Sequence, residues 1–277
     1  MPGTLYVVAT PLGNLGDLST RATEVLRAVP VVAAEDTRRT RGLLTHLGAA
    51  PQLLSYHAHS DQGRLDTLLD ILAGGRDVAL VSDAGTPVVS DPGTDLVAAA
   101  RAAGITIVPI PGPSAVATAL SAAGLKGDRF LFLGFIPRKG GERTRLVARA
   151  AAEEWSVVFF EAPPRLVDLL TDLAQAAGGS RRAVVARELT KLHEELRLGT
   201  LEELAGYYTE HPPRGELTIV LEGTGAPEQR PDRTAEAVEL AHRLLGEGVT
   251  RREVVRQICE ALGLPRNDAY RLVMELP

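Results

Sequence analysis

The sequence has a single cysteine, Cys259, and no long apolar run. One cysteine cannot form a disulfide within the chain, which excludes a disulfide-stapled secreted domain and fits a reducing compartment. No segment approaches the roughly 18 consecutive apolar residues of a membrane-spanning helix. The first residues enter a short β-type run without a basic or long apolar leader. We therefore expect a soluble, cytoplasmic protein without a membrane partner.

Aromatic side chains and positive charge are also scarce. Aromatic residues make up 4% of the chain, which leaves little scope for a base-stacking platform. The formal net charge of −5 argues against a general nucleic-acid coat, because non-specific phosphate binding needs many cations. A local basic face stays compatible with this charge. The cations are 27 arginines and 3 lysines, and arginine can engage two phosphate oxygens at once.

Two further kinds of site have no sequence signal. The histidines and the cysteine do not have the spacing of a zinc site, and no Ser-His-Asp set is forced by the sequence. We expect no metal.

Short apolar strands alternate with helices in the first part of the chain. We predict strands at residues 5–9, 31–34, 77–81 and 106–110, with helices at 21–28, 40–47, 64–73 and 95–103. Such alternation favours a mostly parallel sheet with helices on both faces. After a small-residue helix at 114–123, a second strand and helix series at 130–221 suggests a mixed sheet.

The end of the chain has a different pattern. Residues 223–232 are rich in Gly, Pro and polar residues and are typical of a linker. Helical patterns follow, and two of them around a Gly-containing turn resemble a helix-turn-helix. We predict an α/β fold with two α/β domains, at residues 1–125 and 126–226, and a small helical module at 227–277.

Three loops follow predicted strands, at residues 9–17, 81–93 and 109–116. Open α/β sheets bind ligands beyond the carboxyl ends of their strands. The first loop lacks the G-x-G-x-x-G fingerprint, which disfavours a dinucleotide. In the second loop, Asp83 is placed to receive an ammonium or a ribose hydroxyl, whereas Asp91 before Pro92 is interpreted as a helix cap or turn former. In the third, Ser114 is predicted to cap a helix.

Six segments in this order resemble the bacterial ribosomal RNA small subunit methyltransferase I family of the tetrapyrrole methylase superfamily. They are TPLGNLGD (10–17), AEDTR (34–38), SDAGTP (82–87), PGPSA (111–115), EAPPR (161–165) and RELTKLHEE (187–195). The resemblance implies the tetrapyrrole-methylase fold, with S-adenosyl-L-methionine as the cofactor in the cleft between two α/β domains, and a homodimer. It also implies the acceptor, the ribose 2′-hydroxyl of a cytidine in 16S rRNA of the assembled small ribosomal subunit.

The same resemblance implies which residues bind the methyl donor. From the first domain they are Pro11, Leu12, Asp83, Thr86, Ser114 and Ala115. From the second they are Phe160, Ala186 and Arg187, with the segment before Thr218. The first loop departs from the Gly-x-Gly-Pro-Gly-Asp pattern of tetrapyrrole-synthesis enzymes, which argues against a porphyrinoid acceptor.

Methyl transfer to a ribose hydroxyl needs a group that takes up one proton. Asp36 is the first candidate, because it follows a strand at the carboxyl edge of the sheet. A helix cap is the alternative interpretation of Asp36 and of Glu35. Lys191 and His193 form the second candidate group, and a solvated charged turn is its alternative.

Arginines beside these candidates are predicted to contact RNA phosphates. Arg38, Arg39 and Arg41 form one cluster, and Arg165 and the basic run at 138–149 extend it. Ordinary solvated helix faces are the alternative for that run.

Two other functions remain open at this level. One is methylation of a tetrapyrrole or other non-RNA acceptor by an enzyme of the same fold. The other is a non-catalytic nucleotide- or DNA-binding protein that uses the terminal helices.

Overall fold

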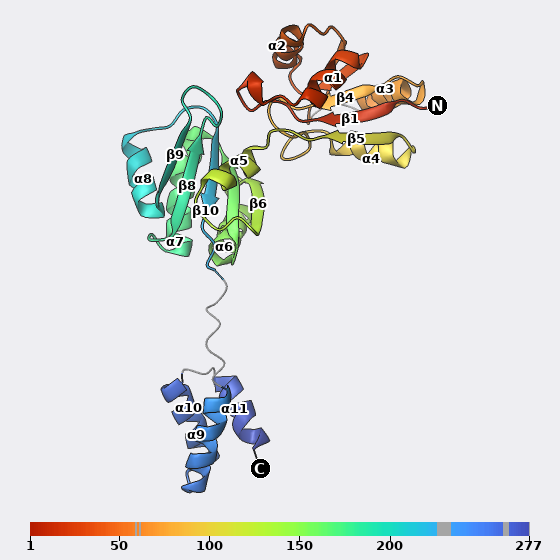
Figure 1. Cartoon of the computed structure of the whole chain (residues 1–277). Helices are drawn as coiled ribbons and strands as arrows, with labels where there is room; N and C mark the ends of the chain where they lie inside the picture. The colour runs from red at the N-terminus through yellow and green to blue at the C-terminus, as the bar shows by residue number, and fades with distance from the viewer. Residues whose placement is uncertain (59, 61, 226–233, 263–265, 277) are drawn as a thin grey trace. The chain divides into compact units, whose positions relative to one another are not determined.

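The computed structural model describes residues 1–58, 60, 62–225, 234–262 and 266–276. The chain forms two compact units, Met1–Thr224 and Gly225–Pro277. In the described residues, the first unit contains two five-stranded sheets and the second contains three helices (Figure 1). This confirms the predicted α/β class with terminal helices. The three domain boundaries stay predictions, and residues 226 and 227 lie outside the described residues.

The first sheet is parallel throughout, in the order β3-β2-β4-β1-β5. Strands β2 and β4 are buried at every residue, as expected where helices cover both faces of a parallel sheet. The strands are β1 (Thr4–Val8), β2 (Val31–Ala34), β3 (Gln52–Ser55), β4 (Val78–Val81) and β5 (Thr106–Ile110).

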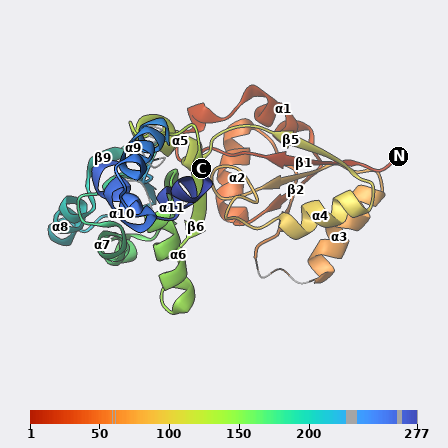
Figure 2. The same cartoon turned by 90° about the horizontal axis from the view of Figure 1, so that it is seen from below.

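Alternate residues of these strands pack against different helices. Val32 of β2 lies in a core with Leu26 of α1, whereas Val31 lies in a core with Leu68 of α3. Helices α1 and α2 therefore cover one face, and α3 and α4 cover the other, where Figure 2 shows them side by side. The helices are α1 (Thr20–Ala28), α2 (Thr37–Leu47), α3 (Gln62–Ala73) and α4 (Thr94–Ala102), with the short 3-10 turn η1 (Leu15–Asp17) before α1.

Strand β3 is not among the strands predicted from the sequence. It is a four-residue edge strand with polar ends, so it has neither the apolar run of a central strand nor a clear alternation. The strand forms because it pairs with β2, from Val31 opposite Gln52 to Ala34 opposite Ser55.

The second sheet is mixed, as predicted, in the order β6-β7-β10-β8-β9. β6 and β7 are parallel, and the other neighbours are antiparallel. The strands are β6 (Phe130–Phe135), β7 (Ser156–Glu161), β8 (Arg182–Arg187), β9 (Glu195–Thr200) and β10 (Leu217–Leu221).

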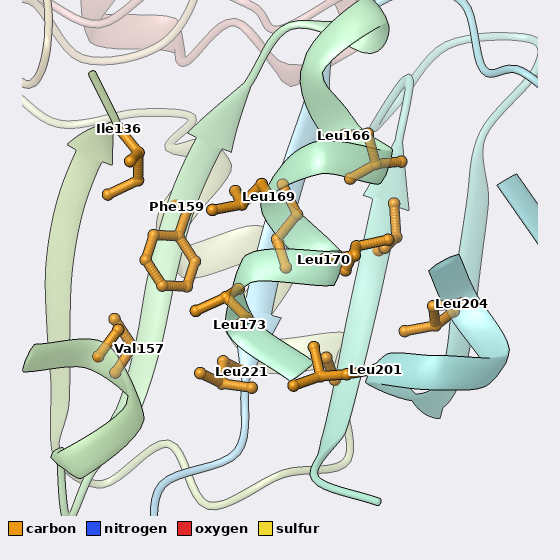
Figure 3. Packing of buried hydrophobic residues seen from close by; sticks show 14 of the residues in the cluster. Ile136, Val157, Phe159, Leu166, Leu169, Leu170, Leu173, Leu201, Leu204 and Leu221 are labelled. Carbon is orange, nitrogen blue, oxygen red and sulfur yellow. The ribbon is translucent and has the colours of Figure 1, made fainter. Parts of the chain in front are cut away.

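Helices α6, α7 and α8 pack on one face of this sheet. Figure 3 shows Leu166, Leu169, Leu170 and Leu173 of α7 against Phe159 of β7, all completely buried. These leucines recur at the spacing of one helix face, which is why the helix was recognisable from sequence. The helices are α6 (Gly141–Ala152), α7 (Leu166–Ala177) and α8 (Leu201–Glu210), with the turn η2 (Pro163–Arg165) before α7.

Helix α5 (Ala115–Ala122) covers the opposite face of the second sheet (Figure 1). Val116 of α5 shares a core with Val158 of β7 and Val220 of β10. Leu12, from the loop after β1, belongs to the same core. The loops at the carboxyl edge of the first sheet are thereby fixed against the second sheet.

The second unit contains α9 (Thr234–Gly246), α10 (Arg251–Leu262) and α11 (Arg266–Glu275). Its core includes Ala241, Val254 and Ile258, and Cys259 lies half-buried against it. Among the residues described in the two units, no helix combines the length and apolarity required to cross a membrane.

Candidate functional site

A cavity of about 500 Å³ lies between the carboxyl-end loops of the first sheet and one end of the second sheet. From the first sheet it is lined by Leu12, Glu35, Asp83, Thr86, Asp91 and Ser114, among others. From the second it is lined by Phe135, Phe160, Glu161, Glu216, Leu217 and Thr218. The lining has carboxylates and hydroxyls beside an apolar wall, which suits a ligand with polar and apolar parts.

The three sequence-predicted loops are hydrogen-bonded to one another at this cavity. Thr10 and Gly85 exchange backbone hydrogen bonds of 2.8 and 3.0 Å. Thr86 donates its hydroxyl to the carbonyl of Pro113 at 3.1 Å. Gly85 has φ +82°, a conformation that glycine adopts at little cost. The loops therefore form one preformed wall.

Asp36 and Asp83 are linked across neighbouring strands of the first sheet. The amide of Asp36 donates to Oδ1 of Asp83 at 2.9 Å, and Asp83 Oδ2 lies 3.6 Å from the guanidinium of Arg39. Asp36 caps α2 and accepts hydrogen bonds from the amide and side chain of Arg38. These hydrogen bonds hold the pKa of Asp36 well below its usual range.

The pKa values of Asp91 and Glu35 are shifted upward, in the opposite direction from that of Asp36. Burial, together with the charges of Glu35 and Asp83, raises the pKa of Asp91 to about 6, against the lowering effect of a hydrogen bond with Ser82. Burial also raises the pKa of Glu35, whose Oε2 accepts from the amide of Asp83 at 3.4 Å. Both carboxyl groups line the cavity, and each is a stronger base than an ordinary carboxylate when ionised.

Lys191 joins the first loop to the second sheet. Its Nζ lies 2.8 Å from Glu188 Oε1 and 2.9 Å from Glu216 Oε2, and Glu216 lines the cavity. Burial alone would lower the pKa of Lys191, but these two carboxylates outweigh it and raise the pKa. The aliphatic stem occupies the space where a side chain on Gly13 would be. Lys191 is therefore a fixed ammonium.

The predicted donor residues are largely gathered at the cavity. Leu12, Asp83, Thr86, Ser114, Ala115 and Phe160 line it. Ser114 also caps α5, as predicted. Of the residues that the structure describes, the lining set leaves out Pro11, Ala186 and Arg187. Ala186 is buried beneath the lining, opposite Thr218 in the sheet, and Arg187 pairs with Glu195 at 3.2 Å.

The predicted RNA-contacting arginines are divided. Arg38, Arg39 and Arg41 lie together on α2, and of these three only Arg39 is in the described lining of the cavity. Arg165 lines a second cavity of about 680 Å³ with Arg138 and Arg143. Its guanidinium also pairs with Glu161 and donates to the carbonyl of Ile136.

Comparison with known proteins shows the family of this chain. Residues 4–205 match the family profile Tetrapyrrole (Corrin/Porphyrin) Methylases. The chain belongs to the tetrapyrrole methylase family. Within the family it groups with proteins named ribosomal RNA small subunit methyltransferase I. The relative from a Synechocystis species is 46% identical over 99% of this chain and 98% of its own. The one from Pseudomonas aeruginosa is 44% identical over 99% and 97%.

Two solved structures share the fold. Uroporphyrin-III C-methyltransferase from Thermus thermophilus, complexed with S-adenosylhomocysteine, has a TM-score of 0.59 at 20% identity, covering 79% of this chain and 97% of that one. A diphthine synthase has a TM-score of 0.61 at 16% identity, covering 79% and 90%. Family membership confirms the predicted fold and the prediction of an S-adenosylmethionine-dependent methyltransferase.

Asp91 and Phe135 are two lining residues that sequence reasoning did not assign to the site of this methyltransferase. Asp91 was interpreted as a cap or turn former, although its loop was recognised as functional. Phe135 had no signal, because a strand irregularity brings it to the cavity, whereas Glu216 lies in the predicted segment before Thr218.

Proposed function

We propose that this methyltransferase transfers a methyl group to the ribose 2′-hydroxyl of a cytidine in 16S rRNA, within the assembled small ribosomal subunit. The observation that carries the proposal is near full-length similarity, at 40–46% identity, to proteins named for small-subunit ribosomal RNA.

The cavity fits the methyl donor in size and chemistry. A volume of about 500 Å³ lies within the usual range of small-molecule sites, roughly 300–1,000 Å³. Leu12, Phe160 and Leu217 offer apolar surface for a planar base, and Asp83 is available to a ribose hydroxyl or an ammonium group. S-adenosylmethionine supplies an electrophilic methyl group on a sulfonium. The predicted residues Pro11, Ala186 and Arg187 would support this pocket from behind the lining.

The acceptor hydroxyl must lose a proton as its oxygen forms the new bond to carbon. Asp36 is deprotonated but weakly basic, because Arg38 stabilises its charge. Lys191 is a paired ammonium and has no free electron pair to accept a proton. These electrostatics favour Asp91 over the two residues predicted from sequence. We assign one role to each residue. Asp91 accepts the proton, Asp36 positions Asp83, and Lys191 joins the first loop to the second sheet.

The RNA backbone would be held by the arginines near the cavity. Arg39 lines the cavity, and its side chain is 60% exposed to solvent. Arg38 and Arg41 extend the positive charge along α2. Arg165 would contact the RNA backbone from the neighbouring cavity. Phosphate contacts of this kind orient a nucleic acid without reading its sequence. The target would then be selected by the shape of the assembled subunit.

The homodimer and the cytoplasmic location belong to the same proposal. A cytoplasmic enzyme meets ribosomal subunits directly. Light scattering of the purified chain measures its oligomeric state, and a monomer at micromolar concentration would contradict the dimer.

The test of the function is transfer of a labelled methyl group from S-adenosylmethionine to small subunits that lack the modification. Naked 16S rRNA and uroporphyrinogen serve as parallel acceptors, and the labelled nucleotide is mapped. We expect label on one cytidine ribose in the assembled subunit. Label on the tetrapyrrole alone would move the function to a non-RNA acceptor. Duplex DNA binding that does not respond to the donor, with no methyl transfer, would favour a binding protein.

A further inference from the structure

The phenylalanines of this chain are concentrated in two neighbouring strands. All five lie in β6 or β7, at positions 130, 132, 135, 159 and 160. Phe159 belongs to the core beneath α7, but Phe132 and Phe160 turn to the other face, toward α5. Phe160 also lines the cavity. A protein with few aromatic residues thus has several of them beside its ligand site.

An irregularity in β6 adds Phe135 to this group. The β6–β7 register shifts between Phe132 and Phe135, so that Phe135 pairs with Phe160. In a regular strand, Phe132 and Phe135 would point to opposite faces, because side chains alternate. The shift lets both rings contact Phe160 edge-to-face, at centroid distances of 4.9 and 5.6 Å. Bulges next to active sites commonly redirect a side chain in this way.

Gly134 makes the irregularity possible and lies close to the loop that follows β4. Its φ is +61°, in the left-handed region that favours glycine. A Cβ atom at Gly134 would lie 2.9 Å from Oγ of Ser90, in the loop that carries Asp91. Phe135 is therefore fixed next to the loop that we assign to proton transfer.

The ring of Phe135 remains accessible at the mouth of the cavity. Its exposed fraction is 56%, although it lines the cavity. Val89, from the loop of Ser90, is 41% exposed and lines the cavity too. An exposed aromatic ring and an exposed aliphatic side chain that line the same cavity as several carboxyl groups offer a surface for one flat heterocycle. Unstacked RNA bases are bound on such aromatic rings.

We infer that Phe135 stacks on the nucleobase of the acceptor nucleotide and thereby positions its ribose toward Asp91. The inference rests on the proposed RNA acceptor. Phe160, deeper in the lining and contacted by two rings, remains on the donor side. Phe135 is a positioning residue, and its effect is on acceptor binding.

The experiment compares Phe135→Ala with Phe135→Trp and with Phe130→Ala. Phe130 is on the same strand and 44% exposed, but it is not among the described residues of the lining, so it is the matched control. We expect Phe135→Ala to lower kcat/KM for subunits by about 5- to 100-fold, mainly through KM, as the loss of one stacked base predicts. Phe135→Trp should retain activity, and Phe130→Ala should match the wild type.

Two binding measurements separate this inference from the proposed function. Calorimetry should give the same S-adenosylmethionine affinity for Phe135→Ala and wild type. A short oligoribonucleotide with a fluorescent cytosine analogue, titrated in the presence of S-adenosylhomocysteine, should be quenched by the wild type and not by Phe135→Ala. Weakened donor binding, or equal quenching by both proteins, would overturn the inference even if subunits are methylated. Absent methyl transfer by the wild type would overturn the proposed function, while the quenching comparison still decides the role of Phe135.

Discussion

The backbone amide of Asp36 donates a hydrogen bond of 2.9 Å to Oδ1 of Asp83, 47 residues further along the chain. Asp36 follows β2 and Asp83 follows β4, and these strands are neighbours in the first sheet. The bond fixes the relative position of two loops that line the cavity. It also leaves Oδ2 of Asp83 directed toward Arg39 at 3.6 Å.

Asp83→Ala should weaken donor binding more than Asp83→Asn. The asparagine retains an oxygen that can accept from Asp36, whereas alanine leaves that amide without its acceptor. A lost hydrogen bond of this type costs about 1 kcal/mol of stability. Thermal denaturation and calorimetric titration with S-adenosylmethionine measure both effects. Equal behaviour of the two variants would show that the link is dispensable.

Asp91→Asn should stabilise the protein at pH 8. The pKa of Asp91 is raised to about 6, so the folded protein binds this proton more tightly than the unfolded chain does. The ionised side chain of Asp91 therefore disfavours folding. The contribution of this carboxyl group to stability is fully present below pH 4 and is lost as the pH rises through 6. With allowance for solvent screening, we expect a gain of about 1 kcal/mol at pH 8.

Urea unfolding at pH 4.5 and pH 8 measures this difference. The gain should shrink at the lower pH, where the wild-type carboxyl group is largely protonated in the folded protein. Asp70→Asn, at an exposed position of α3, is the control for the substitution itself. A gain that is the same at both pH values would contradict the raised pKa.

The single-turnover rate of the wild type should fall as the pH decreases through about 6. Ionised Asp91 accepts the proton of the hydroxyl, and protonated Asp91 cannot. Burial of this carboxyl group is the main cause of its raised pKa, and Ser82, Glu35 and Asp83, which face it, adjust the midpoint. Asp91→Asn should be slow and lack the inflection, whereas Asp91→Glu should recover part of the rate. An unchanged inflection in Asp91→Asn would assign the proton to another group, with Glu35 and Asp36 tested next.

Gly13→Ala should lower stability through Lys191. A Cβ atom on residue 13 would clash with Cγ of Lys191, so the stem must move, which disturbs the contacts of its ammonium with Glu188 and Glu216. Exposed ion pairs are worth about 0–1 kcal/mol, and we expect a loss of that size.

A double-mutant cycle tests this contact. In a Lys191→Ala background, Gly13→Ala should have little further effect, giving a coupling of at least about 0.5 kcal/mol. Gly42→Ala is the matched control, because nothing lies within 4 Å of a Cβ atom there, and in helix α2 it should stabilise slightly. If the effects of Gly13→Ala and Lys191→Ala on stability were strictly additive, Lys191 would move aside without a cost in stability.

Arg39→Ala and Arg41→Ala should each weaken subunit binding and reduce its salt dependence. Each lost phosphate contact lowers the slope of log K against log salt by about 1. Arg101→Ala, on helix α4, which covers the other face of the first sheet, is the control. Filter binding between 50 and 300 mM KCl measures the slopes. An effect of Arg101→Ala as large as the other two would indicate non-specific attraction.

Most of the fold could be predicted from local sequence. Strands β2 and β4 are continuous apolar runs because both faces are buried, and α7 repeats leucine on one face. Strand β3 could not be predicted, since its pairing with β2 depends on residues distant in sequence and its own pattern is short and polar. The loops of the site were recognisable because Gly, Pro and Asp gather after apolar strands.

The chemical roles of the site residues were less predictable. Asp36 and Asp91 are both aspartates that follow strands of the first sheet, but only the lowered pKa of Asp36 has a local cause, and nothing near Asp91 in the sequence predicts that its pKa is raised. The difference arises because Arg38, two residues further along, hydrogen-bonds to Asp36, while Asp91 is half-buried near two other carboxyl groups.

The sequence by itself determined the family, the alternation of strands and helices, and the loops that surround the cavity. These properties depend on residue types at short spacing, which a chain carries before it folds. Only the tertiary structure decided which groups meet in the cavity. Burial of Asp91, the contact of Lys191 with Gly13 and the turn of Phe135 toward Phe160 each depend on residues from distant segments. Desolvation and strand register are properties of the packed molecule, so no local pattern encodes them.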